Sequence, residues 1–228
     1  RNTLRWILGS LDGFSDAETV PADAMPELER WVLHRMAEID TRIRAAVASH
    51  DWGGVYPAIH EFCASDLSAF YFDIRKDAIY CDRPDSLRRR AARTVLDHLH
   101  RALAAWLAPV LCFTAEEAWT ARFGEESSVH LELFPVPPPG WRDDALAAKW
   151  ERIRAIRRRV TVPIEEARAA KTIGASLQAA VELPLAPDEA GLLDDSLWAE
   201  AAIVSTLRTV PGAAEEPGLV GGERELHG

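Results

Sequence analysis

The stretch MPELERWVLHRMAEIDTRIRAAVAS, residues 25–49, has a regular apolar pattern that decides the fold of the first half of the chain. Its apolar side chains recur every third or fourth position. They are Leu28, Val32, Met36, Ile39, Ile43 and Val47. Because an α-helix has 3.6 residues per turn, this spacing places all six on one helix face. The stretch therefore predicts a long amphipathic helix that packs one side against other helices.

A second apolar stripe follows across residues 55–74. Asp51 precedes it and is a candidate N-cap, because its carboxylate can accept from a backbone N–H of the first turn. The stripe consists of Val55, Ile59, Phe62, Leu67, Phe70 and Ile74. Pro57 fits a helix only near the first turn, since deeper inside it removes a hydrogen bond and clashes with the preceding turn. We therefore expect the helix to begin near Gly53-Gly54, or to be kinked.

Two more helices are predicted before residue 124. A turn at Arg83-Pro84-Asp85 introduces a helix that runs to about Leu107. Its inward residues should be Leu87, Val95, Leu99, Leu103 and Trp106. Thr114-Ala115-Glu116-Glu117 has the form of a capping box and predicts a short helix from Thr114. Residues 1–134 thus form an antiparallel helical bundle.

The character of the sequence changes after Gly124. Residues 129–134 are expected to be extended, and the Pro-rich residues 135–141 to form a stiff linker at the main domain boundary. Residues 142–210 predict a small α+β subdomain. It comprises a helix that ends near Val162-Pro163 or continues to Lys171, strands at 177–185 and 203–210, and a helix at about 188–202. Residues 211–228 offer little to bury and are predicted to be a disordered tail. The fold class is mainly α.

The bulk composition is that of a soluble globular protein, with 48% hydrophobic and 27% charged residues. No apolar run approaches the roughly 18–20 residues needed to span a bilayer. The abrupt amphipathic start without Met leads us to expect a segment of a longer protein. The three cysteines, Cys63, Cys81 and Cys112, share no C-x-x-C spacing, which favours reduced thiols in the cytoplasm over a metal site or disulfides.

The net charge of −10 argues at first against a nucleic-acid partner. Most of that charge lies in residues 182–228, which contain ten acidic residues and two arginines. Residues 1–181 therefore carry a net charge of only −2. Within that larger part, arginines cluster at 88–93 and 152–159. The acidic balance therefore says little about the helical region.

Sequence motifs of catalysis are absent: the chain has no phosphate-binding glycine loop, no H-E-x-x-H and no G-x-S-x-G string. His60 and Cys63 could form a nucleophile pair, but that spacing on a helix is far more often packing. Asp66, Asp73 and Asp77 share a helix face, where ion pairs with nearby basic residues are the better interpretation. We expect no catalytic residue and no metal ligand in this chain.

The arginine clusters are the remaining candidate sites. Arg88, Arg89, Arg90 and Arg93 begin a helix, where the positive end of the helix dipole favours phosphate contact. A solvated helix face would show the same charge run. Trp141 could stack on a base, and core packing explains it equally well. Residue chemistry alone thus predicts a helical interaction domain for which RNA is one candidate partner.

A longer motif resembles a known family. Residues 62–80, FCASDLSAFYFDIRKDAIY, are similar to the F-C-x-x-D-L-S-x-F-Y-x-D-x-x-K-D-x-L-Y segment of the helical anticodon-binding domain of bacterial isoleucyl-tRNA synthetases, with Ile79 in place of Leu. Further similarities follow in the same order along the chain. They lie at residues 1–5 (R-N-T-x-R), 29–31 (D-R-W, with Glu29), 93–96 (Q-T-V-L, with Arg93), 107–119 (L-A-P-x-x-x-F-T-A-E-E-x-W), 128–131 (S-V-H-L) and 171–179 (K-x-I-G-x-S-L-E-A, with Gln178).

The resemblance implies the tRNA-reading part of an isoleucine–tRNA ligase. The parent enzyme, a cytoplasmic protein expected to be monomeric, would use ATP and Mg to attach isoleucine to its tRNA. This chain lacks the H-I-G-H and K-M-S-K-S signatures and the editing domain, so alone it should be inactive and need no cofactor. Bacterial members of the family often end in a cysteine zinc ribbon. Because this chain has no C-x-x-C, we expect that ribbon to be missing or to have been cut off after Val210, so zinc is expected only in such a missing ribbon.

The implied partner is isoleucine tRNA. Charge placement, rather than the resemblance, selects the residues that would contact it: Arg88, Arg89, Arg90 and Arg93, with Arg157, Arg158 and Lys171 from the second subdomain. Two alternatives remain open at this point. The L-A-P and I-G-x-S-L-E-A strings also resemble valyl-tRNA synthetase, and a helical protein–protein docking module would fit the charge distribution as well.

Overall fold

A computed structural model describes residues 1–212 and 218–220. The chain divides into two compact units, Arg1–Ala147 and Ala148–Gly228, which we call unit 1 and unit 2. None of the helices in the described ranges combines the length and the apolar character needed to cross a bilayer.

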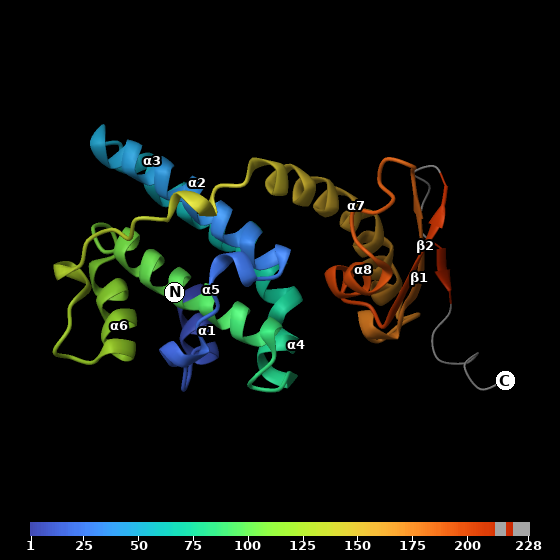
Figure 1. The fold of residues 1–228 in the computed structure, drawn as a ribbon, viewed down its shortest axis with the longest axis horizontal. Coiled ribbons are helices and arrows are strands. Elements are labelled where there is room, and N and C mark those ends of the chain that lie inside the picture. Colours follow the sequence, from blue (N-terminus) through green and yellow to red (C-terminus); the bar gives the residue numbers. More distant parts are fainter. Residues whose placement is uncertain (213–217, 221–228) are drawn as a thin grey trace. The chain divides into compact units, whose positions relative to one another are not determined.

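Unit 1 is a bundle of helices, as predicted (Figure 1). The helix α5 contacts α1, α2, α4 and α6, and its buried side chains form the centre of the core. The helical elements are α1 (Asn2–Ser10), α2 (Glu27–Ala48), α3 (Trp52–Glu61), the π-helix η3 (Phe62–Phe72), α4 (Asp73–Cys81), α5 (Leu87–Leu107) and α6 (Cys112–Phe123), with 3₁₀ turns η1 (Asp16–Glu18), η2 (Ala22–Ala24), η4 (Val129–Leu131) and η5 (Pro139–Trp141).

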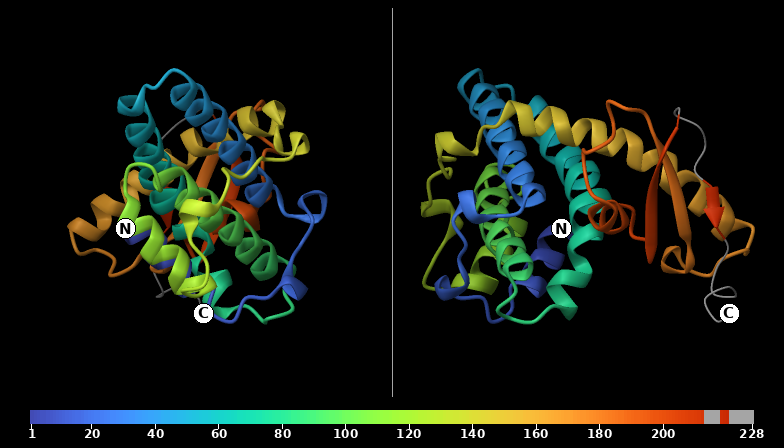
Figure 2. Two further views of the ribbon diagram at one scale, coloured as in Figure 1. Left: turned by 90° about the vertical axis from the view of Figure 1, so that its left-hand side faces the viewer. Right: turned by 45° about the vertical axis from the view of Figure 1, so that its right-hand side comes forward.

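The helix α2 confirms the prediction made from residues 25–49. Every member of its apolar stripe except Val47 is buried. Figure 2 shows α2 lying beside the α3–η3–α4 segment, with which it shares contacts along α3 and η3. The stripe therefore acts as the helix-packing surface that its spacing indicates.

The segment from α3 to α4 departs from a simple helix. Asp51 is the N-cap, as predicted, and its Oδ1 accepts from the backbone N–H of Gly54 at 3.2 Å. The predicted start near Gly53-Gly54 is confirmed to within one residue, because α3 begins at Trp52; Pro57 then lies in the second turn of the helix rather than the first. Its ring is exposed, and the hydrogen bond it lacks would have gone to the carbonyl of Gly53. The following π-helix was not predicted.

Three smaller predictions also need correction. Leu87 is 51% exposed, because it is the first residue of α5. The helix α6 begins at Cys112, so Thr114 is no cap; Glu117, its partner in the predicted box, instead accepts from the guanidinium of Arg1 at 2.8 and 2.6 Å. Residues 129–134 form no strand, and Val129–Leu131 is a 3₁₀ turn.

The expected linker at 135–141 belongs to unit 1. Arg44 donates to the carbonyls of Phe134 and Pro135 at 3.2 and 2.8 Å, and the ring of Trp141 meets that of His98 at 5.0 Å. These contacts attach the Pro-rich segment to the bundle. The division between the units falls inside α7 (Asp144–Ala169). The helix thus continues past Pro163, in agreement with the longer of the two predicted extents.

Unit 2 is a small α+β fold, as predicted. Its sheet has the order β2-β1-β3, from β1 (Ala180–Leu185), β2 (Thr206–Pro211) and β3 (Gly218–Val220). The strands β1 and β2 are parallel and are joined through α8 (Asp195–Ala202); β3 pairs antiparallel to β1. Alternate residues of β1 are buried, and Trp198 of α8 is fully buried in the same unit. The end of β2 at Pro211 and the strand β3 lie where a disordered tail was expected, and residues 213–217 and 221–228 of that prediction lie outside the described ranges.

Candidate nucleic-acid interface

The first two arginines of α5 are attached to the turn that precedes the helix. Arg88 forms a bidentate pair with Asp82, with N–O distances of 2.9 and 2.7 Å. Hydrogen bonding from Arg88 lowers the pKa of the Asp82 carboxyl. Arg89 donates to the backbone carbonyl of Asp82 at 3.1 Å. Both side chains remain partly exposed, so each can present guanidinium surface to an anion while it holds the turn.

Arg90 and Arg93 face a different part of the bundle. Arg90 donates to the carbonyl of Glu18 at 3.1 Å. Arg93 is only 5% exposed; its guanidinium contacts both carboxylate oxygens of Glu18, at 3.0 and 2.8 Å, and the carbonyl of Asp12 at 2.6 Å. A side chain held in this way cannot reach a phosphate. The phosphate contact predicted for Arg93 is therefore corrected: the residue anchors the segment between α1 and α2.

This assignment leads to a prediction for Arg93→Ala. The variant should lose about 1.5–3 kcal/mol of unfolding free energy, because hydrogen bonds that involve charged groups contribute on that order. Its affinity for RNA should stay within about twofold of the wild type when both are folded, since the removed group faces the interior. Chemical denaturation and a filter-binding titration measure the two quantities. A normal stability with weakened RNA binding would contradict the anchoring role.

The candidate residues of unit 2 are more exposed. Arg157 donates to the carbonyl of Ala201 at 2.6 Å and so joins α7 to α8. Arg158 lies next to it on an exposed position. Lys171 is also exposed and has a φ of 59°, which turns the chain sharply after α7 ends. Arg158 and Lys171 are therefore the predicted residues that offer cations to solvent in this unit.

The residues considered for catalysis form no reactive site. Burial raises the pKa of the Cys63 thiol to about 11, which keeps it protonated and a poor nucleophile at neutral pH. Asp73 pairs with Lys76 at 2.9 Å, as the ion-pair interpretation predicted, whereas Asp66 pairs with Arg35 of α2 at 3.0 Å. Across the residues that the structure describes, His, Cys, Asp and Glu side chains nowhere gather in the threes that would hold a metal ion.

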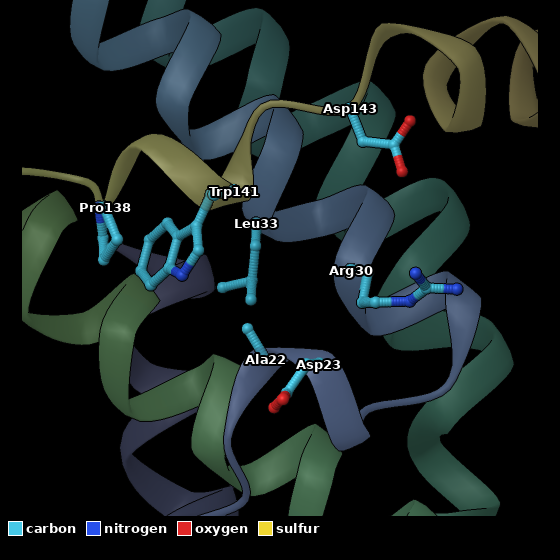
Figure 3. Close-up of a pocket in the computed structure, with 8 residues that line it drawn as sticks. Ala22, Asp23, Arg30, Leu33, Pro138, Trp141 and Asp143 are labelled. Carbon is cyan, nitrogen blue, oxygen red and sulfur yellow. The ribbon is translucent and has the colours of Figure 1, made fainter.

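A cavity of about 520 Å³ in unit 1 was not predicted (Figure 3). It lies between η2, the first half of α2 and the residues that lead into α7. Its lining residues are Ala22, Asp23, Arg30, Leu33, Pro138, Gly140, Trp141 and Asp143. Of these residues, the sequence indicated only Trp141 as a candidate contact. The lining residues come from three separated segments and share no motif. Their proximity is a result of the fold alone.

Comparison with known proteins gives a consistent result. Residues 29–183 match the family described as "Anticodon-binding domain of tRNA ligase". The chain is 58% identical over 214 residues to a protein of Gluconobacter oxydans named isoleucine–tRNA ligase, 49% identical over 218 residues to one of Mesorhizobium japonicum, and 50% identical over 206 residues to one of Rhodopseudomonas palustris. These matches cover 93%, 95% and 90% of this chain, but only 22%, 22% and 20% of the respective relatives. The chain thus spans about a fifth of their length.

Proposed function

The chain belongs to the family of tRNA-ligase anticodon-binding domains, and from this premise we propose that it holds the anticodon stem-loop of isoleucine tRNA for an isoleucine–tRNA ligase. Family membership implies tRNA binding. The choice of isoleucine is supported by 58% identity, over nearly the whole chain, to a ligase of that name. This identity is the observation that carries the proposal.

The reaction itself is assigned to the parent enzyme. That enzyme would join isoleucine to its tRNA with ATP and Mg, in the cytoplasm and as a monomer. The part described here would position the tRNA rather than perform chemistry. Consistent with this division of roles, the pKa of the Cys63 thiol is raised, and Asp66 and Asp73 are held in ion pairs.

The binding surface we propose is narrower than the arginine clusters suggest. Arg93 is buried, and Arg90, although partly exposed, donates to the backbone carbonyls of residues 17–19. In unit 1, Arg88 and Arg89 keep exposed surface. In unit 2, Arg158 and Lys171 are exposed, and Arg157, which precedes Arg158 in α7, is half-buried. Cations of this kind contact the phosphate backbone, which sets affinity and orientation without reading the sequence.

The test is a filter-binding titration of the 228-residue chain with purified isoleucine and valine tRNAs at two salt concentrations. We expect tighter binding of isoleucine tRNA, and an affinity that falls as salt rises because phosphate contacts release counterions. Equal affinity for both tRNAs would remove the amino-acid assignment. Absence of tRNA binding at low salt would overturn the proposed function and favour a protein-docking role.

The double variant Arg158→Ala/Lys171→Ala tests the surface of unit 2. It should weaken tRNA binding and reduce the slope of log affinity against log salt by about 2, since each lost phosphate contact removes about 1. Arg208→Ala is the matched control, because Arg208 is exposed in the same unit but lies opposite Glu182 in the sheet. A double variant with the wild-type salt slope would exclude these two residues from the interface.

A further inference from the structure

The cavity described above, which we call the Trp141 pocket, has two chemically different walls. Leu33, Pro138 and Trp141 provide an apolar side, whereas Asp23, Arg30 and Asp143 bring charged groups. Figure 3 shows the indole of Trp141 beside Pro138 and Leu33, with the guanidinium of Arg30 across the hollow from it. A volume of about 520 Å³ is within the range of small-molecule sites.

The indole is fixed in place before any ligand arrives. The ring of His98 meets it edge-on, with centroids 5.0 Å apart. Two residues further along, the N–H of Asp143 donates to Nδ1 of the buried His34 at 2.9 Å. The Asp143 carboxylate in turn accepts from the N–H of Leu146 at 2.9 Å, which caps the start of α7. Held on both sides, Trp141 offers a preorganised surface for stacking, which lowers the entropic cost of binding.

The charged wall offers both donors and acceptors. The Nε of Arg30 is buried and has no hydrogen-bond partner within the part of the chain that the structure describes. Asp23 is exposed and presents a carboxylate at the rim. A phosphate would meet two carboxylates here and be repelled. The pocket therefore suits a flat, neutral group whose edge both donates and accepts.

Guanine has this combination of properties. Its O6 and N7 accept from arginine in the commonest specific protein–base contact. Its N1–H and 2-amino group form a pair of donors that a carboxylate can accept. Its ring system stacks on indoles, as unpaired bases in RNA loops do on aromatic side chains. We propose that the Trp141 pocket binds a guanine base splayed out of the tRNA anticodon loop, with Trp141 stacking on it, Arg30 donating to O6 or N7, and Asp23 accepting from the N1–H and the 2-amino group. This inference rests on the proposed function.

The first test measures stacking. The chain is titrated with an anticodon stem-loop RNA of isoleucine tRNA, and Trp141→Ala should weaken binding about tenfold, because loss of base stacking has effects of this size. Trp141→Phe should retain most of the affinity. Trp52→Ala, which changes a 38% exposed tryptophan of α3 outside the pocket, is the control and should bind as the wild type does. Equal binding by all variants would overturn the inference.

The second test identifies the base. Each guanine of the loop is replaced in turn by inosine, which lacks only the 2-amino group. One replacement should weaken binding to the wild type about fivefold, and the same replacement should have no further effect on Asp23→Asn. Asp16→Asn, an exposed aspartate outside the pocket, should respond as the wild type does. The base assignment would be overturned if every inosine replacement weakened binding equally, or if no replacement changed the affinity.

The two proposals fail in different ways. If the wild-type chain binds the stem-loop but neither Trp141→Ala nor the inosine series changes the affinity, the pocket proposal falls and the proposed function stands. If the wild-type chain binds no tRNA at low salt, the proposed function falls, and the pocket proposal falls with it.

Discussion

Arg75→Ala is expected to lower the free energy of unfolding by about 3–5 kcal/mol, because it leaves the carboxylate of Glu29 buried without its counterion. Glu29 is 0% exposed and Arg75 3%. The guanidinium is bidentate on the carboxylate, with distances of 2.5 Å from Nε to Oε1 and 2.9 Å from Nη2 to Oε2. The pair joins α2 to α4. An uncompensated charge at this depth has no access to water, so the loss should be among the largest of any single substitution in unit 1.

Tyr71 belongs to the same network. Its hydroxyl donates to Oε1 of Glu29 at 3.2 Å. Burial raises the pKa of Tyr71 well above its ordinary value, with the neighbouring carboxylate adding to the effect, so the phenol stays protonated as a donor. Glu29 therefore receives hydrogen bonds from two side chains of the η3–α4 segment.

Urea denaturation followed by circular dichroism measures this prediction. The double variant Glu29→Met/Arg75→Met should be less destabilised than Arg75→Ala, since replacing both partners leaves no unpaired charge. Arg83→Ala removes an exposed pair with Asp85, at side-chain exposures of 84% and 70%, and should change stability by less than about 1 kcal/mol. An Arg75→Ala variant as stable as Arg83→Ala would show that the buried pair is not needed.

Trp198→Ala should destabilise unit 2 by about 3–5 kcal/mol, the usual cost of deleting a large aromatic side chain from a core. Trp198 is 0% exposed and lies on α8, which packs against β2, where Leu207 is also buried. Its indole N–H is buried and makes no hydrogen bond among the described residues. Trp198→Phe should therefore cost much less, because it keeps most of the apolar volume and removes an unsatisfied donor.

Hydrogen exchange measured by mass spectrometry separates the effect on the two units. In Trp198→Ala, the amides of β1 and β2 should lose protection while those of α2 and α5 keep theirs, because the two units have separate cores. Loss of protection in α2 and α5 as well would show that the units unfold together.

Helical periodicity predicted the elements whose side chains pack in simple stripes. The predicted stripe of α2 is buried except for Val47. The inward residues predicted for α5 are buried except for Leu87, but α5 is also buried on its other sides because α1, α2, α4 and α6 surround it. The resemblance of residues 62–80 to isoleucyl-tRNA synthetases predicted the family, which the comparisons confirm. Signals of this kind can be recognised in the sequence because each depends on residues that lie close together along the chain.

The functional surface was less predictable, because the sequence does not show whether a charged side chain points to solvent or to another part of the fold. Arg90 and Arg93 look like their neighbours Arg88 and Arg89, yet they anchor residues more than 70 positions earlier in the chain. The Trp141 pocket likewise joins segments that are far apart in sequence. Long-range contacts of this kind leave no periodicity or spacing that could be recognised in advance.

The π-helix Phe62–Phe72 has a consequence for how this region tolerates changes in chain length. Its backbone N–H groups bond to carbonyls five residues earlier rather than four, so each turn holds more residues than an α-turn. The segment can lose one residue by tightening into an α-helix, while α3 and α4 on either side keep the same side chains buried. In evolution, a one-residue deletion here would be absorbed within the helix, whereas the same deletion inside α2 would rotate every later side chain of that helix away from its partner.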